Sequence, residues 1–420
     1  MPDRVTPPSL ALATFVADDV VVADANTWKD GRLTLDLGSL MSSVVDPALA
    51  SVQIEVVRPG DQVRIANVLD AVLPDVKVDE PERTFPGALG GLALAGRGRT
   101  NRIEGIGVLS VCDWLAAGYT QPEDLPDSLI DMGGPGAEMT RWGRTVNVVV
   151  RSVPVPGGPL RDVDRAVRRA SLRVARELAV TTIGTEASRI ETIERPRTHV
   201  DRDLPAICAI LQVASEGPLT DTFLYGHEVG GIVPTLMDAA ELLDGALTNG
   251  AYDWPAVRNV TANYQDSSLI RSLLAGHGER LRFAGLIMAL GYLDTAFEKQ
   301  RSAMLSARLA ESCGADGVVC TTFSSGNSHT DTMLTVRACE SLGIRTTAIV
   351  SETNGGLTDH VAEADSIVSV GNEDQLVEPW TPDRMIGAER PVRVGEPVPT
   401  WAYLGACVQT GDTSLTAVPA

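Results

Sequence analysis

An alternation of strand-like and helix-like segments in the last third of the sequence constrains the fold most strongly. Apolar runs typical of buried strands alternate there with stretches whose apolar residues recur at helical spacing. Strands are expected at 281–290, 316–322, 346–350 and 366–370, and helices at 267–275, 294–312, 330–342 and near Asp359. This alternation predicts a doubly wound, mainly parallel sheet with flanking helices.

The N-terminal part of the sequence has a β-rich character instead. Turn-forming residues, such as Arg58-Pro59-Gly60-Asp61 and Phe85-Pro86-Gly87, separate short apolar or alternating runs. The candidate strands lie at 32–37, 53–58, 63–72 and 103–111. Short strands with turns between them are typical of a small barrel or sandwich.

A third pattern connects these two regions. Residues 146–150 and 205–213 have the continuous apolar character of buried strands, and 162–179 have apolar residues at helical spacing. We therefore expect an α/β protein in three parts. These are a β-rich N-terminal domain at 1–120, a first α/β segment at 121–250, and a second α/β segment with an extended C-terminal tail at 251–420.

The charge balance argues against two classes of partner. The 420 residues include 55 acidic and 35 basic side chains, which gives a formal net charge of −20. Nucleic acids and anionic membranes attract basic patches, so neither is an expected partner. The N-terminus lacks a basic region followed by an apolar run, and the longest apolar stretch, 281–290, is too short to span a bilayer. These features predict a cytoplasmic protein.

The cysteines and the short motifs predict neither a metal site nor a nucleotide site. No two cysteines form a CxxC pair, which argues against a structural zinc site or a disulfide framework. The sequence contains no P-loop, GxSxG or HExxH motif, and the pair His227-Glu228 lacks the second histidine of a zinc site.

The loop from Phe323 to Asp331 is the strongest candidate for a binding site. It follows an expected strand and leads into an expected helix, and ligands bind at the carboxyl ends of strands in such sheets. Ser325, Gly326 and Asn327 are candidates for substrate binding, and His329 and Asp331 for proton transfer. Asp331 is also expected to accept hydrogen bonds or to hold His329 in one tautomer. The alternative is that Ser328, Thr330 or Asp331 only caps the helix.

Further candidates follow the next two strands. Glu352 is a candidate amine ligand or base, with Asn354 beside it, and Gly371-Asn372 would close the same crevice. The alternative for Glu352 is a solvated loop carboxylate. Cys320 precedes the first loop but lies within an apolar strand. The two alternatives for this residue are a buried structural thiol and a catalytic nucleophile.

Eight short motifs, in order, resemble one known family, the precursor-type subunit of glycine/sarcosine/betaine reductase component B. Two of them together resemble the family's DMSGPGA…NNVVVV signature, at 131–138 and at 145–150. The others are Arg58-Pro59-Gly60 with Val63-Arg64-Ile65, Phe85-Pro86-Gly87, Pro234-Thr235-Leu236, Asp244-Gly245-Ala246, Gly326-Asn327 with Thr330-Asp331, and Gly371-Asn372. The resemblance extends from about residue 30 to about residue 380.

This resemblance implies a subunit of a reductive amine-cleaving complex. Family members are made as proproteins and cut at an internal Asn-Cys, and the new terminal cysteine becomes a pyruvoyl group that engages the substrate amine. The partner subunit carries the thiol or selenol that takes the substrate carbon. A hetero-oligomer acting on a small amino or carboxyl substrate is therefore expected.

The sequence departs from the family at the processing position. After Asp244-Gly245-Ala246 the chain reads Leu247-Thr248-Asn249-Gly250-Ala251-Tyr252, and no cysteine occurs between Cys208 and Cys313. Self-cleavage needs a Ser, Thr or Cys side chain, so Asn249, Gly250 and Tyr252 form a degenerate processing site. We expect an unprocessed chain without pyruvoyl or other cofactor, whose reaction is a reductive C–N or related C–S chemistry.

Two alternatives to this function stay open at the level of the sequence. The first is a non-catalytic scaffold that stabilises the thiol- or selenol-bearing partner. The second is an independent enzyme that uses Cys320 or His329.

Overall fold

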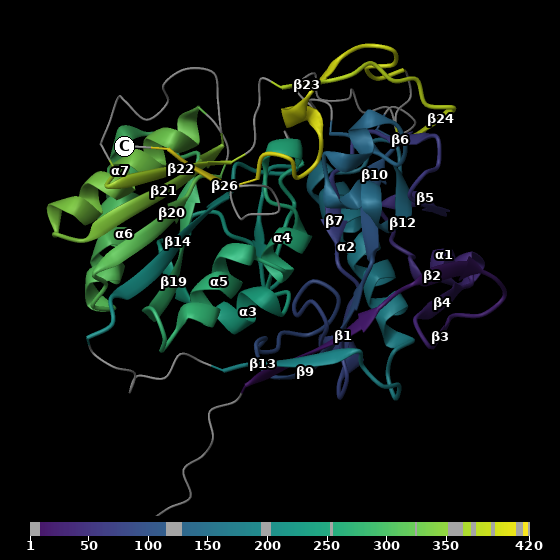
Figure 1. The fold of residues 1–420 in the computed structure, drawn as a ribbon. Coiled ribbons are helices and arrows are strands. Elements are labelled where there is room, and N and C mark those ends of the chain that lie inside the picture. The colour runs from purple at the N-terminus through teal and green to yellow at the C-terminus, as the bar shows by residue number, and fades with distance from the viewer. Residues whose placement is uncertain are drawn as a thin grey trace, which may run out of the picture.

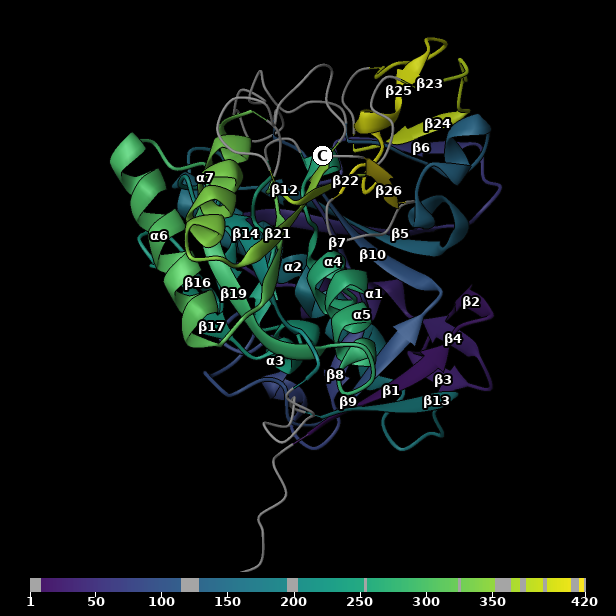
Figure 2. The same cartoon turned by 60° about the vertical axis from the view of Figure 1, so that its left-hand side comes forward.

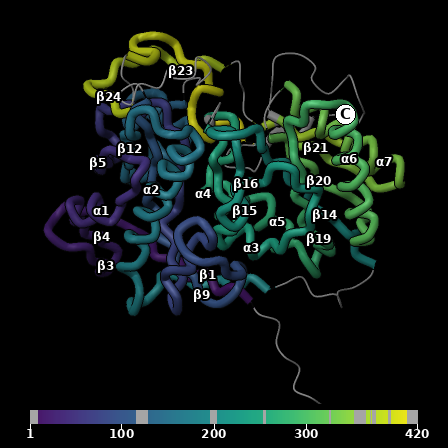
Figure 3. Tube along the Cα trace, turned by 180° about the vertical axis from the view of Figure 1, so that it is seen from behind, coloured from purple at the N-terminus to yellow at the C-terminus, as the bar shows by residue number. Residues whose placement is uncertain are grey.

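The computed structural model describes residues 9–114, 128–194, 203–252, 255–323, 326–351, 364–370, 375–387, 391–408 and 415–418. A seven-stranded sheet with its helices forms one side of the molecule, and a β-rich region forms the other (Figure 1). The same division is seen from behind, where the N-terminal chain lies on one side and the green C-terminal half on the other (Figure 3).

The large sheet confirms the predicted α/β fold. Its strand order is β17-β19-β14-β20-β21-β22-β26, and the five inner strands are parallel. These inner strands are β14 (Ala206–Ala214), β19 (Arg282–Gly291), β20 (Gly317–Thr321), β21 (Arg345–Ser351) and β22 (Ser366–Val370). The edge strands β17 (Thr235–Met237) and β26 (Leu415–Val418) are antiparallel. The sequence analysis predicted neither edge strand.

Helices cover both faces of this sheet, which makes it doubly wound. On one face, α6 (Ala296–Ser312) and α7 (Asn327–Ser341) pack against Cys208 and Ile210 of β14. On the other face, α3 (Ala239–Leu243) and α5 (Ser268–Gly276) pack with α4 (Thr261–Gln265) beside Ala209 and Leu211 (Figure 2). Successive strand residues point to opposite faces, so β14, which is apolar except for Gln212, can bury both faces.

The β-rich region contains two four-stranded sheets, β13-β1-β9-β8 and β5-β12-β10-β7. The helix α2 (Leu160–Val180) contacts both sheets. The strands are β1 (Leu10–Val16), β5 (Leu49–Val57), β7 (Asp70–Val72), β8 (Asp75–Lys77), β9 (Gly98–Glu104), β10 (Ile106–Cys112), β12 (Val146–Pro154) and β13 (Arg189–Ile193). Smaller sheets contain β2 (Asp19–Val22), β3 (Thr27–Lys29), β4 (Arg32–Leu35), β6 (Val63–Ile65), β11 (Ile130–Asp131) and β24 (Arg384–Ile386).

Two apolar runs that the sequence analysis treated as single strands are each divided. The run 63–72 contains β6 and β7, and the run 103–111 is split between β9 and β10, which lie in different sheets. Gly105 separates β9 from β10 with a φ of 87°. A Cβ atom there would lie 2.8 Å from the carbonyl oxygen of Ala17, so the turn requires glycine.

Sheet membership crosses the expected boundary at residue 120. β12 follows that boundary in the chain, yet it pairs with β5 and β10 of the N-terminal region. β24, near the C-terminus, pairs with β6 (Figure 1). The division into segments at 120 and 250 stays a prediction. Among the described residues, every helix is too short or too polar to be a transmembrane span.

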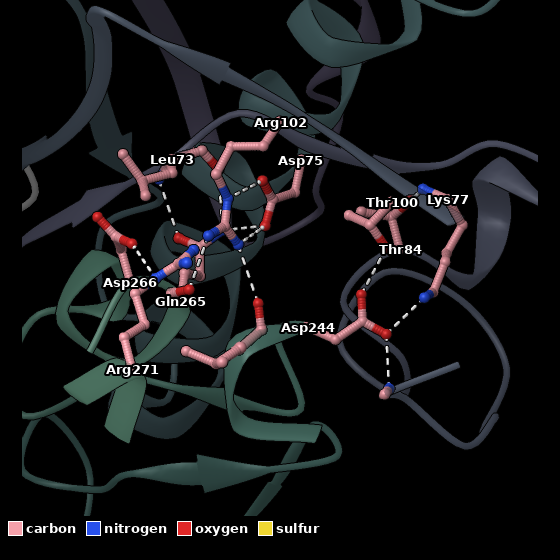
Figure 4. Close-up of polar contacts among 12 residues, drawn as sticks. Leu73, Asp75, Lys77, Thr84, Thr100, Arg102, Asp244, Gln265, Asp266 and Arg271 are labelled. Atoms are coloured by element: carbon pink, nitrogen blue, oxygen red, sulfur yellow. Dashed lines mark hydrogen bonds and ion pairs between the residues drawn. The ribbon is translucent and has the colours of Figure 1, made fainter. Parts of the chain in front are cut away.

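A buried polar network joins the two sides of the molecule (Figure 4). Arg102 of β9 binds both carboxylate oxygens of Asp75 at 2.7 Å and donates to the carbonyl oxygens of Gln265 and Leu243. Asp244, at the end of α3, accepts hydrogen bonds from the Thr100 hydroxyl at 2.5 Å and from Lys77 at 2.5 Å. Because these partners come from both sides of the molecule, the network fixes how the two sides pack.

Candidate functional site at the carboxyl edge of the sheet

The parallel strands end together at one edge of the large sheet. Ala214 of β14 pairs in register with Gly291 of β19, and Leu211 pairs with Thr321 of β20. The residues that follow these strands therefore share that edge, which is where open α/β sheets bind ligands. The predicted loop that begins at Phe323 leaves the sheet at this place.

A cavity of about 360 Å³ opens at this edge. Its walls come from the loops that follow β14 and β19, from the segment 231–234 and from α6. Ile232, Leu290 and Leu293 supply apolar surface, while the charged lining residues are Arg301 and three acids, Glu216, Asp294 and Glu298. The volume lies in the range of small-molecule sites, and the polar lining suits a polar ligand.

Asp331 holds the loop that forms one wall of this cavity. Its carboxylate accepts hydrogen bonds from the backbone N–H groups of Tyr292 and Leu293, at 2.8 and 3.3 Å. Both of its oxygens lie 3.0 Å from Nζ of Lys299, which comes from α6. Burial raises the pKa of Asp331, and the ammonium of Lys299 opposes that rise. The pair therefore ties α6 and α7 to Tyr292, whose φ of 65° is unusual for a non-glycine residue.

His329 is 1% exposed and lies on α7. Neither ring nitrogen has a hydrogen-bond partner among the residues that the structure describes. Burial lowers the pKa of His329 to about 4, so the imidazole is neutral at pH 7. In the described structure Asp331 bonds to Lys299 and to backbone groups, so it does not fix the tautomer of His329 as the sequence analysis expected.

The alternative that Ser328, Thr330 or Asp331 caps the helix is wrong. The N-cap is Gly326, with a φ of 65°, and Ser328, Thr330 and Asp331 lie within the helix. None of these three side chains is therefore the cap. Asn327 instead donates from Nδ2 to the carbonyl oxygen of Leu293 at 3.3 Å, which links the helix start to the cavity wall.

Gln212 is a residue of this edge that the sequence analysis missed. Its Oε1 accepts a hydrogen bond from the backbone N–H of Phe323 at 3.0 Å. Its Nε2 lies 3.5 Å from the carbonyl oxygen of Ser328. A polar residue inside the otherwise apolar run 205–213 was the available signal, because a buried amide requires partners.

Several predicted site residues lie outside the described residues, namely Ser325, Glu352, Asn354, Gly371 and Asn372. Cys320 is buried, and burial raises the pKa of its thiol well above the ordinary value, so the reactive thiolate is disfavoured. Within the described ranges, no group of three or more His, Cys, Asp or Glu side chains is arranged to hold a metal ion.

The degenerate processing segment, residues 249–252, is buried and lies beside the carboxyl edge of the sheet. Ala251 belongs to a small apolar cluster with Ala214, Phe323 and the partly buried Tyr292. Asn249 donates its backbone N–H to the Thr261 hydroxyl at 2.9 Å, and its side chain accepts from the backbone N–H of Ala251. The structure thus brings the segment 249–252 together with the loop that starts at Phe323, although about seventy residues separate them in the sequence.

Gly250 and Tyr252 are both closely packed. A Cβ atom at Gly250 would lie 2.4 Å from the Phe223 ring, so only glycine fits without rearrangement. Tyr252 is fully buried and donates its backbone N–H to the carbonyl oxygen of Leu219 at 2.6 Å. Its phenol ring packs in an apolar cluster that includes Cys112, Trp114 and Val167.

Three of the motifs that carry the family resemblance form long-range contacts. Arg64 and Asp131, from separate motifs, are both fully buried and form a bidentate ion pair with N–O distances of 2.6 and 2.9 Å. Gly87 and Gly226 lie so close that a Cβ atom on Gly87 would be 2.0 Å from the carbonyl oxygen of Tyr225. These motifs therefore stabilise the fold around the site.

Comparisons with known proteins agree with these motifs. Residues 9–396 match the family model described as glycine/sarcosine/betaine reductase component B subunits. The chain is 31% identical over 388 residues to the betaine reductase complex component B subunit alpha of Peptoclostridium acidaminophilum, covering 88% of this chain and 85% of that protein. It is 29% identical over 395 residues to the glycine reductase complex component B subunits alpha and beta of Acetoanaerobium sticklandii, covering 90% and 88%.

A third relative is the sarcosine reductase complex component B subunit alpha of Peptoclostridium acidaminophilum, with 28% identity over 389 residues that cover 90% of this chain and 89% of that protein. No solved structure matches the chain. The matches cover nearly the whole chain and are consistent across three relatives. The chain therefore belongs to the family of glycine/sarcosine/betaine reductase component B subunits.

Proposed function

We propose that this chain is the substrate-binding subunit of a reductase complex that acts on a small amino- or carboxyl-bearing molecule. The observation that carries this proposal is the cavity at the carboxyl edge of the sheet, beside the buried pair Lys299–Asp331. Family membership supports a role in a reductase complex. The complex would be a hetero-oligomer, in which a thiol- or selenol-bearing partner subunit supplies the group that attacks the substrate carbon.

The cavity has the charges that a small zwitterion requires. Arg301 is positioned to attract a carboxylate, and the carboxylates of Glu216, Asp294 and Glu298 to attract an ammonium. The uncharged imidazole of His329 lies on α7, whose start is tied to the cavity wall, and it is able to accept or donate a proton. Ser325, Glu352, Asn354, Gly371 and Asn372 stay proposed contributors on the basis of the sequence alone.

The reaction would proceed without a pyruvoyl group. Formation of that group requires a serine, threonine or cysteine side chain at the cleavage point, and this chain has the buried phenol of Tyr252 there. The residues present therefore do not fit a pyruvoyl group. Activation of the substrate would have to come from hydrogen bonds within the site or from the partner subunit.

The purified chain is expected to remain one polypeptide of 44.5 kDa. Denaturing electrophoresis and intact-mass spectrometry check this expectation. Fragments corresponding to residues 1–251 and 252–420, the second with a carbonyl-reactive end, would show that the chain is processed after all.

Replacing Asp331 with asparagine is expected to lower the activity of the reconstituted complex by at least about tenfold, or roughly 1.4 kcal/mol. The amide can still accept the hydrogen bond from Tyr292, but it no longer neutralises Lys299, so the cavity wall loses its link to α6. Lys299→Met removes the other partner of the pair, and the double variant should cost less than the sum of the single variants. Turnover by the co-purified complex is the measurement.

A matched control lies at the opposite edge of the same sheet. Asp316 accepts a hydrogen bond from the backbone N–H of Ala206 at 2.7 Å, at the amino end of β14. Asp316→Asn should leave activity per folded molecule unchanged. If Asp331→Asn and Lys299→Met also leave it unchanged, the chain acts only as a scaffold for its partner. Activity of the chain alone that is lost in Cys320→Ser would indicate the independent enzyme instead.

A further inference from the structure

Two of the six cysteines meet where α6 ends beside the large sheet. Cys313 is the C-cap residue of α6, and Cys208 lies in β14. All six cysteines lie within the described residues, and Cys313 is partly exposed while the other five are buried. Cys313 is therefore the thiol that a reagent in solution reaches most readily.

The sulfur atoms of these two residues converge on one point of β19. Gly285 of β19 pairs in register with Cys208, after a bulge between Ile207 and Cys208. A Cβ atom on Gly285 would lie 3.4 Å from Sγ of Cys313 and 3.8 Å from Sγ of Cys208. The two thiols are also hydrogen-bonded to each other. Both sulfur atoms therefore border the same space, beside a residue that has no side chain to separate them.

The surroundings give the two thiols different reactivities. Cys208 is fully buried in an apolar cluster with Ile287 and Ala310, and Cys313 packs against the outside of this cluster. Burial raises the pKa of Cys208 above its ordinary range, and the neighbouring Cys313 adds to the rise. The thiolate is the nucleophilic form of cysteine, so exposed Cys313 is the sulfur that reacts with an oxidant, and Cys208 is the second sulfur to react.

We propose that Cys208 and Cys313 are a site of oxidative modification, at which they form a reversible disulfide. With hydrogen peroxide as the oxidant, the sulfur of Cys313 attacks one peroxide oxygen, the O–O bond breaks and one water leaves. The sulfur of Cys208 then attacks the sulfenic acid on Cys313, the S–O bond breaks, and the thiol proton leaves in a second water. The two thiols lose two electrons in total, and one peroxide is reduced to two waters.

This disulfide would join the end of α6 to the interior of the large sheet. β14 leads into Ser215 and Glu216 of the cavity wall, and α6 carries Arg301 in the same wall. The bond would thus fix the spacing of two elements that both reach the cavity. It would also close a loop of about a hundred residues, which restricts the unfolded chain and stabilises the folded one. Neither the substrate nor the partner subunit takes part, so the inference does not rest on the proposed function.

Treatment of the purified full-length chain with hydrogen peroxide tests the site. The thiol count in denaturant is expected to fall by two from the six of the reduced chain, and dithiothreitol should restore it. Peptide mapping by mass spectrometry should identify the bond as Cys208–Cys313. The melting temperature of the oxidised chain should exceed that of the reduced chain by about 5 °C.

Cys313→Ser is the most informative variant, because its partly exposed position tolerates a hydroxyl group. Under the same treatment this variant should keep all five of its remaining thiols. Cys339→Ala is the matched control. Cys339 of α7 lies in the same apolar cluster and interacts electrostatically with Cys208, yet it lies outside the hydrogen-bonded pair. This variant should still lose two thiols and gain the same increase in melting temperature.

Four results would overturn the inference. The wild-type chain could keep all six thiols, or the mapped bond could join Cys208 to Cys339 instead. Peroxide could convert Cys313 to a sulfinic acid while Cys208 stays a thiol, which would show that the two sulfur atoms do not meet. A disulfide that lowers the melting temperature would show that the bond forms only when the native fold is distorted.

Discussion

Replacing Arg102 with methionine is expected to lower the free energy of unfolding by about 3–5 kcal/mol, the usual result of breaking a buried ion pair by removing one partner. Arg102 makes two hydrogen bonds with Asp75 and one each with the carbonyl oxygens of Gln265 and Leu243. Its loss leaves Asp75 buried without its cation, and it leaves two carbonyl groups short of a donor. Urea denaturation followed by circular dichroism is the measurement.

Arg83→Met is the control for this prediction. Arg83 pairs with Glu80 in the same region of the chain, but both side chains are about half exposed. Exposed pairs contribute little, so the expected change is below about 1 kcal/mol. Equal losses for the two variants would show that the network in Figure 4 does not hold the two sides together.

The stability of the protein is expected to depend on pH through two buried carboxyl groups. Burial raises the pKa of Asp70 to about 7, opposed by hydrogen bonds from Thr261 and Ala71 and by Arg168. Burial likewise raises the pKa of Asp164 to about 7, opposed by Leu219 and Arg168, whereas Asp221 and Glu228 add to it. A shift of one pKa unit corresponds to about 1.4 kcal/mol, so each group affects stability by a few kcal/mol.

The sign follows from the protons that each state binds. Between the ordinary value of 3.8 and about 7, the folded chain keeps a proton on Asp164 that the unfolded chain has released. The contribution of this group to stability is therefore complete below pH 3.8 and is lost as the pH rises through about 7. The same holds for Asp70.

Asp164→Asn tests this assignment, because asparagine resembles the protonated acid and can still accept from Leu219. The stability advantage of the variant over the wild type should grow by more than about 1 kcal/mol between pH 5 and pH 8. Urea midpoints measured from pH 5 to pH 8 provide the comparison. Parallel curves for the two proteins would mean that Asp164 is not the titrating group.

The sequence alone determined the parallel core of the large sheet. The spacing of apolar residues along the chain predicts β14, β19, β20, β22, α2 and α6, because burial in a strand or helix repeats every few residues. The order of the motifs in the sequence also predicted the family. The lack of a cysteine near position 252 is likewise evident from the sequence alone.

The tertiary structure alone decided which residues meet. The edge strand β17 is too short to show a period, and β12 gives no local sign that it pairs with β5. Asp331 looked like a partner for its neighbour His329, yet it binds Lys299 from another helix. Strand pairing and buried charge pairs join residues far apart in the sequence, so patterns of neighbouring residues do not predict them.

The buried charges of Asp164 and Arg168 are the clearest case of this limit. In the sequence, these two residues are one helical turn apart on α2, and that spacing gives no sign that distant segments bury them. Folding places the segment 248–252 and Asp70 against that side of the helix, which removes the water that would have solvated both charges. The residue types at this place are set by the sequence, but burial by distant segments is what gives them shifted pKa values and unpaired atoms.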